Sequence, residues 1–380
     1  MVGFATAIAV PSVCLERLGE EFELDLTARG LLGSLRMAAL VAGLLCSGYF
    51  ADRFGKRPFL AAGMICVAAG MAATAGAGGY VALLLAQALV GVGCGALEAL
   101  LNPLIAELNP RTAARDLNVV NALFAVGLLV AAVLTGELLQ AGVSWRVAFL
   151  IWPPLSVAAA VLLAGRGYPA AGQAQLPPAD TAEALARYGF LRSPIFWTLM
   201  VAMFLGGGTE FGMTGWSANY VEEVLQVSTR SGGWTIAFYG LFMALGRLAT
   251  GALVTRMPPT RLMLFSALGC AVATGVLCGV HDLYTAWTML ALGGLFIACF
   301  WPTLLAVASE HLEHSSALFA LLAAAGIAGS TVFSWLIGAV GDWAGLRVGM
   351  GLLPVAMVVQ VGVMWWLGRE VTGAQRRAGH

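Results

Sequence analysis

The sequence predicts an all-helical membrane protein that crosses the bilayer twelve times, in two halves of six helices. Of its 380 residues, 60% are hydrophobic and 11% are charged, whereas soluble domains are about 45–50% apolar and about 25% charged. Twelve crossings of ~20 residues would use roughly 240 positions, which leaves only short loops. This composition excludes a soluble enzyme and a disordered chain. The 20 basic and 20 acidic residues cancel, so nothing indicates nucleic-acid binding.

Apolar runs bounded by glycine, proline and charge define the expected spans, and their length and composition predict helices. They lie near 3–18, 29–50, 58–77, 80–106, 118–141, 146–165, 195–221, 231–255, 260–280, 284–309, 316–340 and 346–368. The longest polar stretch, 166–194, is expected to be a cytoplasmic linker. It would join an N-terminal half, 1–165, to a C-terminal half, 195–380.

The first expected span is short, because only about fifteen residues precede the charged stretch 16–21. Either the sequence begins inside the first helix, or this helix crosses with a tilt or through a locally thinned bilayer.

Basic residues predict the orientation. Thirteen lie in the C-terminal tail and the connections after even-numbered spans, and five lie in the opposite connections. Because positive charge collects on the cytoplasmic side, both termini are expected in the cytoplasm. The expected location is the bacterial cytoplasmic (inner) membrane.

No residue pattern indicates catalysis, a metal or a cofactor. The seven cysteines lie in apolar runs without a CxxC pair, as expected of small buried hydrophobes. The spans contain no nucleophile–base or metal-ligand spacing, so we expect neither an enzyme nor a bound cofactor.

The two halves contain matching features. The run Gly48–Arg57 follows the second span, and a related run, Gly251–Arg256, follows the eighth after a shift of 203 positions. Pro103 and Pro302, 199 positions apart, interrupt the fourth and tenth spans. Proline bends a helix, so these residues predict matched bends, and parallel six-helix repeats characterise one transporter architecture.

The run GYFADRFGKR at 48–57 resembles the loop signature of the major facilitator superfamily. The resemblance implies a transporter with a gate and topological anchor here, away from substrate. Gly48 would allow close helix approach, and Asp52 would face the positive end of a helix. Arg53, Gly55 and Arg57 complete the expected gate.

Further segments resemble the fucose permease branch of sugar–proton symporters: 93–103, 117–118, 208–220, 246–247 and 301–303. This resemblance implies proton-coupled transport of a monosaccharide. Two positions depart from the branch, because Ser12 aligns with a first-helix acid and Phe124 with a polar sugar-binding residue. The proton route and the particular sugar therefore stay open.

Two carboxylates are expected at membrane depth. Glu98 lies ~12 Å from one end of its span and Glu210 lies ~16 Å from the opposite end of its own. Ionisable groups there cost ~2.5–3.5 kcal/mol on insertion scales and suggest function, so we expect both to carry protons. The alternative is a structural hydrogen bond between helices.

Helical spacing places each acid on a polar stripe. The first stripe is Gly91, Gly95, Glu98 and Asn102, and the second is Gly206, Glu210, Thr214 and Ser217. Both stripes are expected to wall a central cavity.

Two arginines also lie within the spans. Arg36 either extends its side chain to the membrane interface or faces the cavity, paired with a glutamate or an anionic substrate. Arg247 is expected to serve helix packing and gating.

The remaining candidates for substrate binding are amides and aromatic residues: Asn102, Asn118, Asn121, Trp216, Tyr220, Tyr239 and Trp301. Aromatic rings could stack on a sugar, although near helix ends they also anchor proteins at the interface.

These features favour a monomeric secondary transporter of a small polar solute, driven by protons, with sodium not excluded. The alternative is an exporter of drugs or amphiphilic metabolites on the same fold. A membrane enzyme or scaffold finds no support in the residue patterns.

Overall fold

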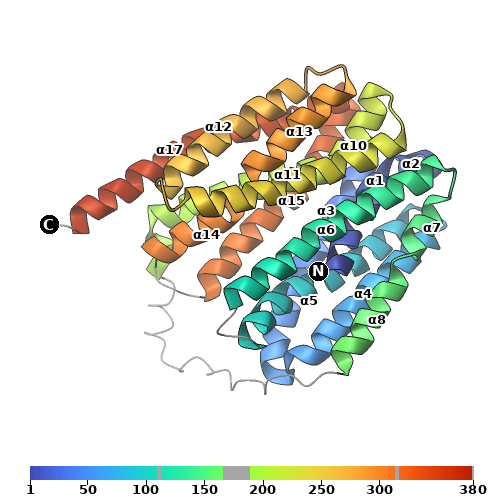
Figure 1. Cartoon of the computed structure of the whole chain (residues 1–380), viewed down its shortest axis with the longest axis horizontal. Coiled ribbons are helices and arrows are strands. Elements are labelled where there is room, and N and C mark those ends of the chain that lie inside the picture. The colour runs from blue at the N-terminus through green and yellow to red at the C-terminus, as the bar shows by residue number, and fades with distance from the viewer. Residues whose placement is uncertain (109–112, 166–188, 313–315, 379–380) are drawn as a thin grey trace.

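The computed structural model describes residues 1–108, 113–165, 189–312 and 316–378, and these are almost entirely helical (Figure 1). The helices before the linker are α1 Val2–Val13, α2 Leu15–Glu21, α3 Leu26–Phe54, α4 Lys56–Ala75, α5 Tyr80–Leu108, α6 Ala113–Gln140, α7 Trp145–Leu150 and α8 Pro153–Ala164. Those after it are η1 Gly189–Arg192, α10 Pro194–Leu225, α11 Thr229–Leu253, α12 Pro259–Leu277, α13 Leu283–Ile297, α14 Phe300–His311, α15 Ser316–Ala344, α16 Leu346–Met350 and α17 Leu352–Ala378.

These helices confirm the predicted twelve-span fold. Among the described residues, 10 helical segments are long and apolar enough to cross a membrane, and α1 with α2 forms an eleventh, bent by 51°. The twelfth crossing is α6, whose apolar stretch Val126–Gln140 is shorter. The pairs α7–α8, α13–α14 and α16–α17 each form one broken span.

The helix bundle has two ends, which we name after residues in their turns. The Asp25 end holds the turns after α2, α4, α6, α10, α12 and α15, and the Gly55 end holds the turns after α3 and α11. Gly55 has φ +83° and ψ 159°, a backbone conformation that is essentially restricted to glycine. This glycine therefore allows α3 to end and α4 to begin within one residue.

Glycines bring helices together within each half. A Cβ on Gly91 would clash with the backbone oxygen of Arg36, and one on Gly95 with that of Leu40. Small residues thus let α5 lie directly against α3. The expectation that Gly91 and Gly95 wall a cavity is wrong, because both glycines are covered by the α3 backbone.

The two halves meet closely at the Asp25 end. A Cβ on Gly30 of α3 would clash with the backbone oxygen of Ser334 on α15, and one on Gly233 of α11 would lie 2.6 Å from that of Ala132 on α6. Near the Gly55 end, by contrast, a Cβ on Gly48 would meet no atom within 4 Å. The close helix approach expected at Gly48 is therefore not formed in this conformation, which is closed at the Asp25 end.

Candidate functional site

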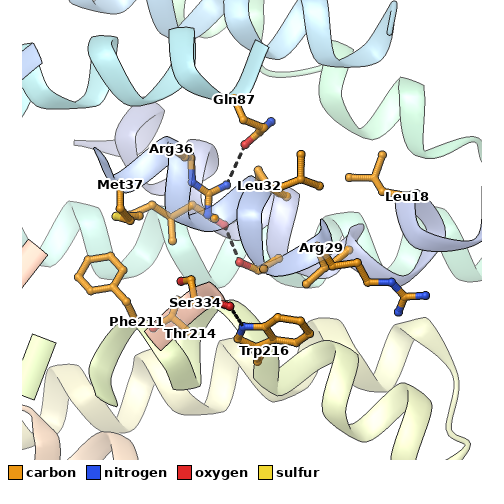
Figure 2. Close-up of a pocket in the computed structure, with 17 residues that line it drawn as sticks. Leu18, Arg29, Leu32, Arg36, Met37, Gln87, Phe211, Thr214, Trp216 and Ser334 are labelled. Atoms are coloured by element: carbon orange, nitrogen blue, oxygen red, sulfur yellow. Dashed lines mark hydrogen bonds between the residues drawn. The ribbon is translucent and has the colours of Figure 1, made fainter. Parts of the chain in front are cut away.

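A small cavity lies between the two halves, on the side of the Asp25 end (Figure 2). Segments of α1, α3 and α5 line it from one half, and segments of α10 and α15 line it from the other. Its volume is about 30 Å³. A buried water needs about 10–15 Å³ of such space, so the cavity has room for water but not for a sugar or an organic acid.

Arg36 lies in this cavity and is only 7% exposed. One terminal nitrogen donates a hydrogen bond of 3.0 Å to Oε1 of Gln87, whose amide nitrogen donates one of 3.0 Å to the hydroxyl of Thr74. The Nε atom of Arg36 has no partner among the described residues. Arg36 therefore does not extend to the membrane interface. In the described structure its partner is an amide, so the expected pairing with a glutamate is wrong for this conformation.

Trp216 and Thr214 line the cavity from α10 (Figure 2). The indole N–H of Trp216 donates to the backbone oxygen of Ser334 at 3.1 Å, and the side chain is 2% exposed. An interface anchor would reach the headgroup region, whereas this indole is buried between the two halves. Trp216 thus lines the cavity between the halves, and its role in substrate binding stays a prediction.

One of the two expected proton carriers has a charged partner. Arg247 of α11 forms an ion pair of 3.3 Å with Glu210 of α10, whose side chain is 12% exposed. Arg247 also acts electrostatically on Glu98 of α5, in the other half. Arg247, expected to serve packing and gating, therefore pairs with Glu210 in this conformation.

Two hydroxyl groups connect Glu210 to its surroundings. Thr214, one turn along α10, donates to the Glu210 backbone oxygen at 2.8 Å, and Tyr239 of α11 donates to the same oxygen at 3.1 Å. Because Thr214 also lines the cavity, the cavity and the Glu210–Arg247 pair are one helical turn apart.

Other candidates lie outside the cavity. The hydroxyl of Tyr220 donates to the backbone oxygen of Leu277 at 2.8 Å, and the side chain is fully buried. Trp301 packs on Gly326, where a Cβ would lie 2.5 Å from the ring. These two aromatic residues serve helix packing in this conformation. The side chains of Asn102, Asn118 and Asn121 fall outside the described residues.

The expected gate lies at the Gly55 end. Arg53 and Arg57 are exposed, and the Arg53 guanidinium lies 5.6 Å from the centre of the Phe54 ring. The side chain of Asp52 falls outside the described residues. The ion pairs between the halves that the structure describes lie at the opposite end, between Arg29 and Glu223 and between Arg230 and Glu137.

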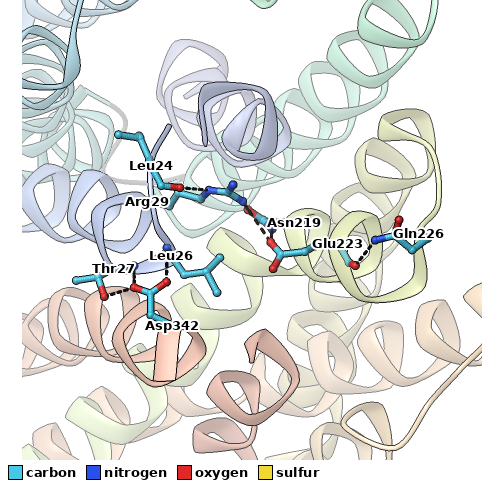
Figure 3. Close-up of polar contacts among 8 residues, drawn as sticks. All are labelled: Leu24, Leu26, Thr27, Arg29, Asn219, Glu223, Gln226 and Asp342. Carbon is cyan, nitrogen blue, oxygen red and sulfur yellow. Dashed lines mark hydrogen bonds and ion pairs between the residues drawn. The ribbon is translucent and has the colours of Figure 1, made fainter. Parts of the chain in front are cut away.

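Asp342 joins the halves at the Asp25 end (Figure 3). Its carboxylate, on α15, accepts hydrogen bonds of 2.7 Å from the backbone N–H groups of Leu26 and Thr27 and one of 2.5 Å from the Thr27 hydroxyl. The first N–H groups of a helix lack partners within the helix and attract negative charge. An acid from one half thus caps a helix of the other half.

Arg29 makes a second link at this end (Figure 3). It donates hydrogen bonds of 3.2 Å to Glu223, to Asn219 and to the backbone oxygen of Leu24. The Asn219 amide also donates to Glu223 at 2.9 Å. These contacts tie α3 to α10 and hold the Asp25 end closed.

No sequence pattern singled out Gln87, the interface acids Glu223 and Asp342, or Glu222, a buried acid near the end of α10. Gln87 is a polar residue within an apolar run, and that signal could have identified it. The three acids lie at the ends of spans, where charge is ordinary, so no sequence signal separates them from surface residues.

Comparisons with known proteins agree with this architecture. The sequence model of the Major Facilitator Superfamily matches residues 1–292 and 220–380. The "Cis,cis-muconate transport protein" of Acinetobacter baylyi is 26% identical over 277 residues, which is 69% of this chain and 65% of that protein. The chain thus aligns with slightly less than two thirds of that relative's length.

Solved structures of similar fold cover nearly the whole chain. A D-xylose–proton symporter has a TM-score of 0.77 at 17% identity, over 96% of this chain and 94% of that one. The transporter FucP, in its outward conformation, has a TM-score of 0.67 at 16% identity, over 96% of each chain. With the twelve-span fold and the match to the family model over both halves, these findings show that the chain belongs to the Major Facilitator Superfamily.

Proposed function

We propose that this membrane transporter carries a small organic anion together with a proton. The observation behind the proposal is Arg36, whose guanidinium is buried in the cavity with no acidic partner in the described part of the chain. An uncompensated buried charge is costly, and ionisable groups at membrane depth mark substrate pathways. A carboxylate matches the planar fork of a guanidinium and would supply the missing negative charge.

The named relative supports this choice of substrate class. The protein of Acinetobacter baylyi is described as a transporter of cis,cis-muconate, a compound with two carboxylates. The monosaccharide expected from the sequence rests on motif resemblance, and the sugar transporters of similar fold support only the fold. A neutral sugar would leave the charge of Arg36 uncompensated, as would an amphiphilic cation.

The coupling step is assigned to Glu98, Arg247 and Glu210. With both acids ionised, one arginine faces two negative charges. Uptake of one proton leaves one carboxylate for one guanidinium and balances the charge. Because Glu98 and Glu210 belong to opposite halves, this change alters the attraction across the interface. Thr214 lines the cavity and donates a hydrogen bond to the backbone of Glu210. A solute in the cavity would therefore also contact the segment of α10 that carries Glu210.

The transport cycle would move the halves as two bodies, 1–165 and 195–380, joined by the linker 166–194. The described structure supplies a state closed at the Asp25 end. Since basic residues place the Gly55 end in the cytoplasm, this state would be closed to the outside. Opening of the Asp25 end would require the Asp342 and Arg29 contacts to break.

The test is uptake by purified protein in liposomes with an imposed pH gradient, acidic outside. The substrates are a monocarboxylate, a small dicarboxylate, a monosaccharide and a cationic dye. We expect the gradient to drive uptake of a carboxylate and not of the sugar or dye. The variant Arg36→Gln should lose this uptake, whereas Arg261→Gln, which removes an exposed arginine at the start of α12, should keep it. Sugar uptake that is indifferent to Arg36 would overturn the proposal.

A further inference from the structure

Glu222 and Glu16 form a carboxyl pair at the interface of the two halves, near the Asp25 end. We propose that these two groups share one proton, and that this proton holds the Asp25 end closed. The inference rests on the proposed transport cycle but not on the identity of the solute.

Glu222 is buried without compensation. It lies near the end of α10, is 4% exposed, and neither of its carboxyl oxygens has a hydrogen-bond partner among the described residues. Gly232 of α11 provides the space, because a Cβ there would clash with Oε1 of Glu222. The structure thus encloses the carboxyl group and supplies no cation for it.

The next residue in the chain provides a contrast. Glu223 accepts hydrogen bonds from Arg29 at 3.2 Å and from Asn219 at 2.9 Å, and its side chain is 36% exposed. Two consecutive glutamates therefore have opposite environments. Glu223 pairs with an arginine, whereas Glu222 has no ion-pair partner among the described residues.

The groups that face Glu222 come from two helices, α2 and α11. Helix α2 packs against α10, and Glu16 and Arg17 of α2 and Thr229 of α11 are the groups that act on Glu222. Arg17 pairs with Glu20 at 2.9 Å and is 46% exposed, so solvent screens its charge. The thiol of Cys14, at the start of α2, interacts with Glu222 as well.

Two carboxylates that share one site cannot both be ionised without a large cost, and a buried charge without a partner is itself unfavourable. One proton removes both costs, because the protonated group donates a hydrogen bond to the other. The pair joins α2 of one half to α10 of the other. A proton bound here therefore stabilises the closed end, and its loss favours separation of the halves.

The sign of the pH effect follows. The closed state binds the proton more tightly than an open state in which water reaches both groups. The closed end is therefore favoured at low pH and released as pH rises. For one proton, the ratio of closed to open molecules changes by up to about tenfold per pH unit.

The experiment measures closure without solute. Spin labels are placed on Ala141→Cys and His281→Cys, exposed positions at the Asp25 end in opposite halves. In this background serine replaces Cys46, Cys66 and Cys278, the cysteines that are not fully buried. Pulsed electron spin resonance then gives the distribution of distances between the labels from pH 5 to pH 9.

We expect a longer distance to gain population as pH rises. The variant Glu222→Gln, which resembles the protonated acid, should stay closed over the whole range. The control Glu21→Gln, which alters a partly exposed acid paired with Arg146 inside one half, should keep the pH dependence. Should Glu222→Gln not fold, Glu16→Gln serves the same purpose, because its amide can donate to Glu222 and extend closure to higher pH. The proposal is overturned if closure of the unsubstituted protein does not depend on pH. It is also overturned if the pH dependence is unchanged in Glu222→Gln, or in Glu16→Gln where that variant is used instead. Because no solute is present, failure of the organic-anion proposal would not affect this result.

Discussion

Replacement of Arg36 by glutamine should have opposite effects on solute binding and on the stability of the empty protein. Arg36 is 7% exposed and has one hydrogen bond, to Gln87, while its Nε has no partner among the described residues. A hydrogen bond that involves a charged group contributes about 1.5–3 kcal/mol. At about 1.4 kcal/mol per tenfold, loss of one such bond to the solute weakens binding by roughly 10- to 150-fold.

The empty protein should respond in the other direction. Because the charge lacks a counter-ion among the described residues, its removal also removes a desolvation cost, and the thermal unfolding temperature should stay unchanged or rise. A structural arginine would behave differently, since loss of one partner of a buried ion pair costs about 3–5 kcal/mol. Thermal unfolding with and without a carboxylate, together with a binding isotherm, separates these cases.

The variant Gln87→Glu provides a sharper comparison. It places a carboxylate where the amide now accepts from Arg36 at 3.0 Å, so the protein itself would satisfy the arginine. We expect the empty protein to become more stable and anion binding to be lost. Unchanged affinity in Arg36→Gln, or a loss of several kcal/mol of stability without solute, would refute the reasoning.

Three further predictions concern coupling, closure and the turn at Gly55. Glu210→Gln removes the acid that pairs with Arg247 at 3.3 Å, so uptake driven by a pH gradient should fall to background while exchange of solute across the membrane continues; full gradient-driven uptake would leave Glu98 as the sole proton carrier. Asp342→Asn weakens the cap on α3, and loss of a charged hydrogen bond at about 1.5–3 kcal/mol should increase the open fraction in the spin-label experiment at every pH; an unaltered distance distribution would contradict a role in closure. Gly55→Ala imposes a side chain at φ +83°, which costs about 1–3 kcal/mol and should lower the unfolding temperature, whereas Gly251→Ala, inside a helix with no atom near its Cβ, should not.

The apolar runs were sufficient to predict the twelve spans, because the length of such a run is set by the thickness of the bilayer. A tight turn at Gly55 was also predictable, because the loop motif that contains this glycine resembles that of a known family. The position of Glu98 and Glu210 at membrane depth stays a prediction. Depth along a helix follows directly from position in the chain.

Partners across helices were harder to predict. Gln87 lies 51 positions from Arg36, and Arg247 lies 37 from Glu210, so only the packing of the helices brings them together. The stripe of Gly91 and Gly95 was correctly placed on one face, but periodicity does not say whether a face meets a cavity or another backbone. Gly48 shows a third limit of prediction from sequence. A transporter adopts several conformations, and a contact predicted from a motif can be absent from the one conformation described.

The central claim is that a proton gradient drives a small organic anion past Arg36. The most direct measurement is uptake of a radiolabelled dicarboxylate into liposomes that contain the purified protein, with the outside at low pH, for the unmodified protein and for Arg36→Gln. We predict accumulation above equilibrium that collapses when a protonophore removes the gradient and that is absent in Arg36→Gln. Accumulation that survives both the protonophore and the loss of Arg36 would contradict the account.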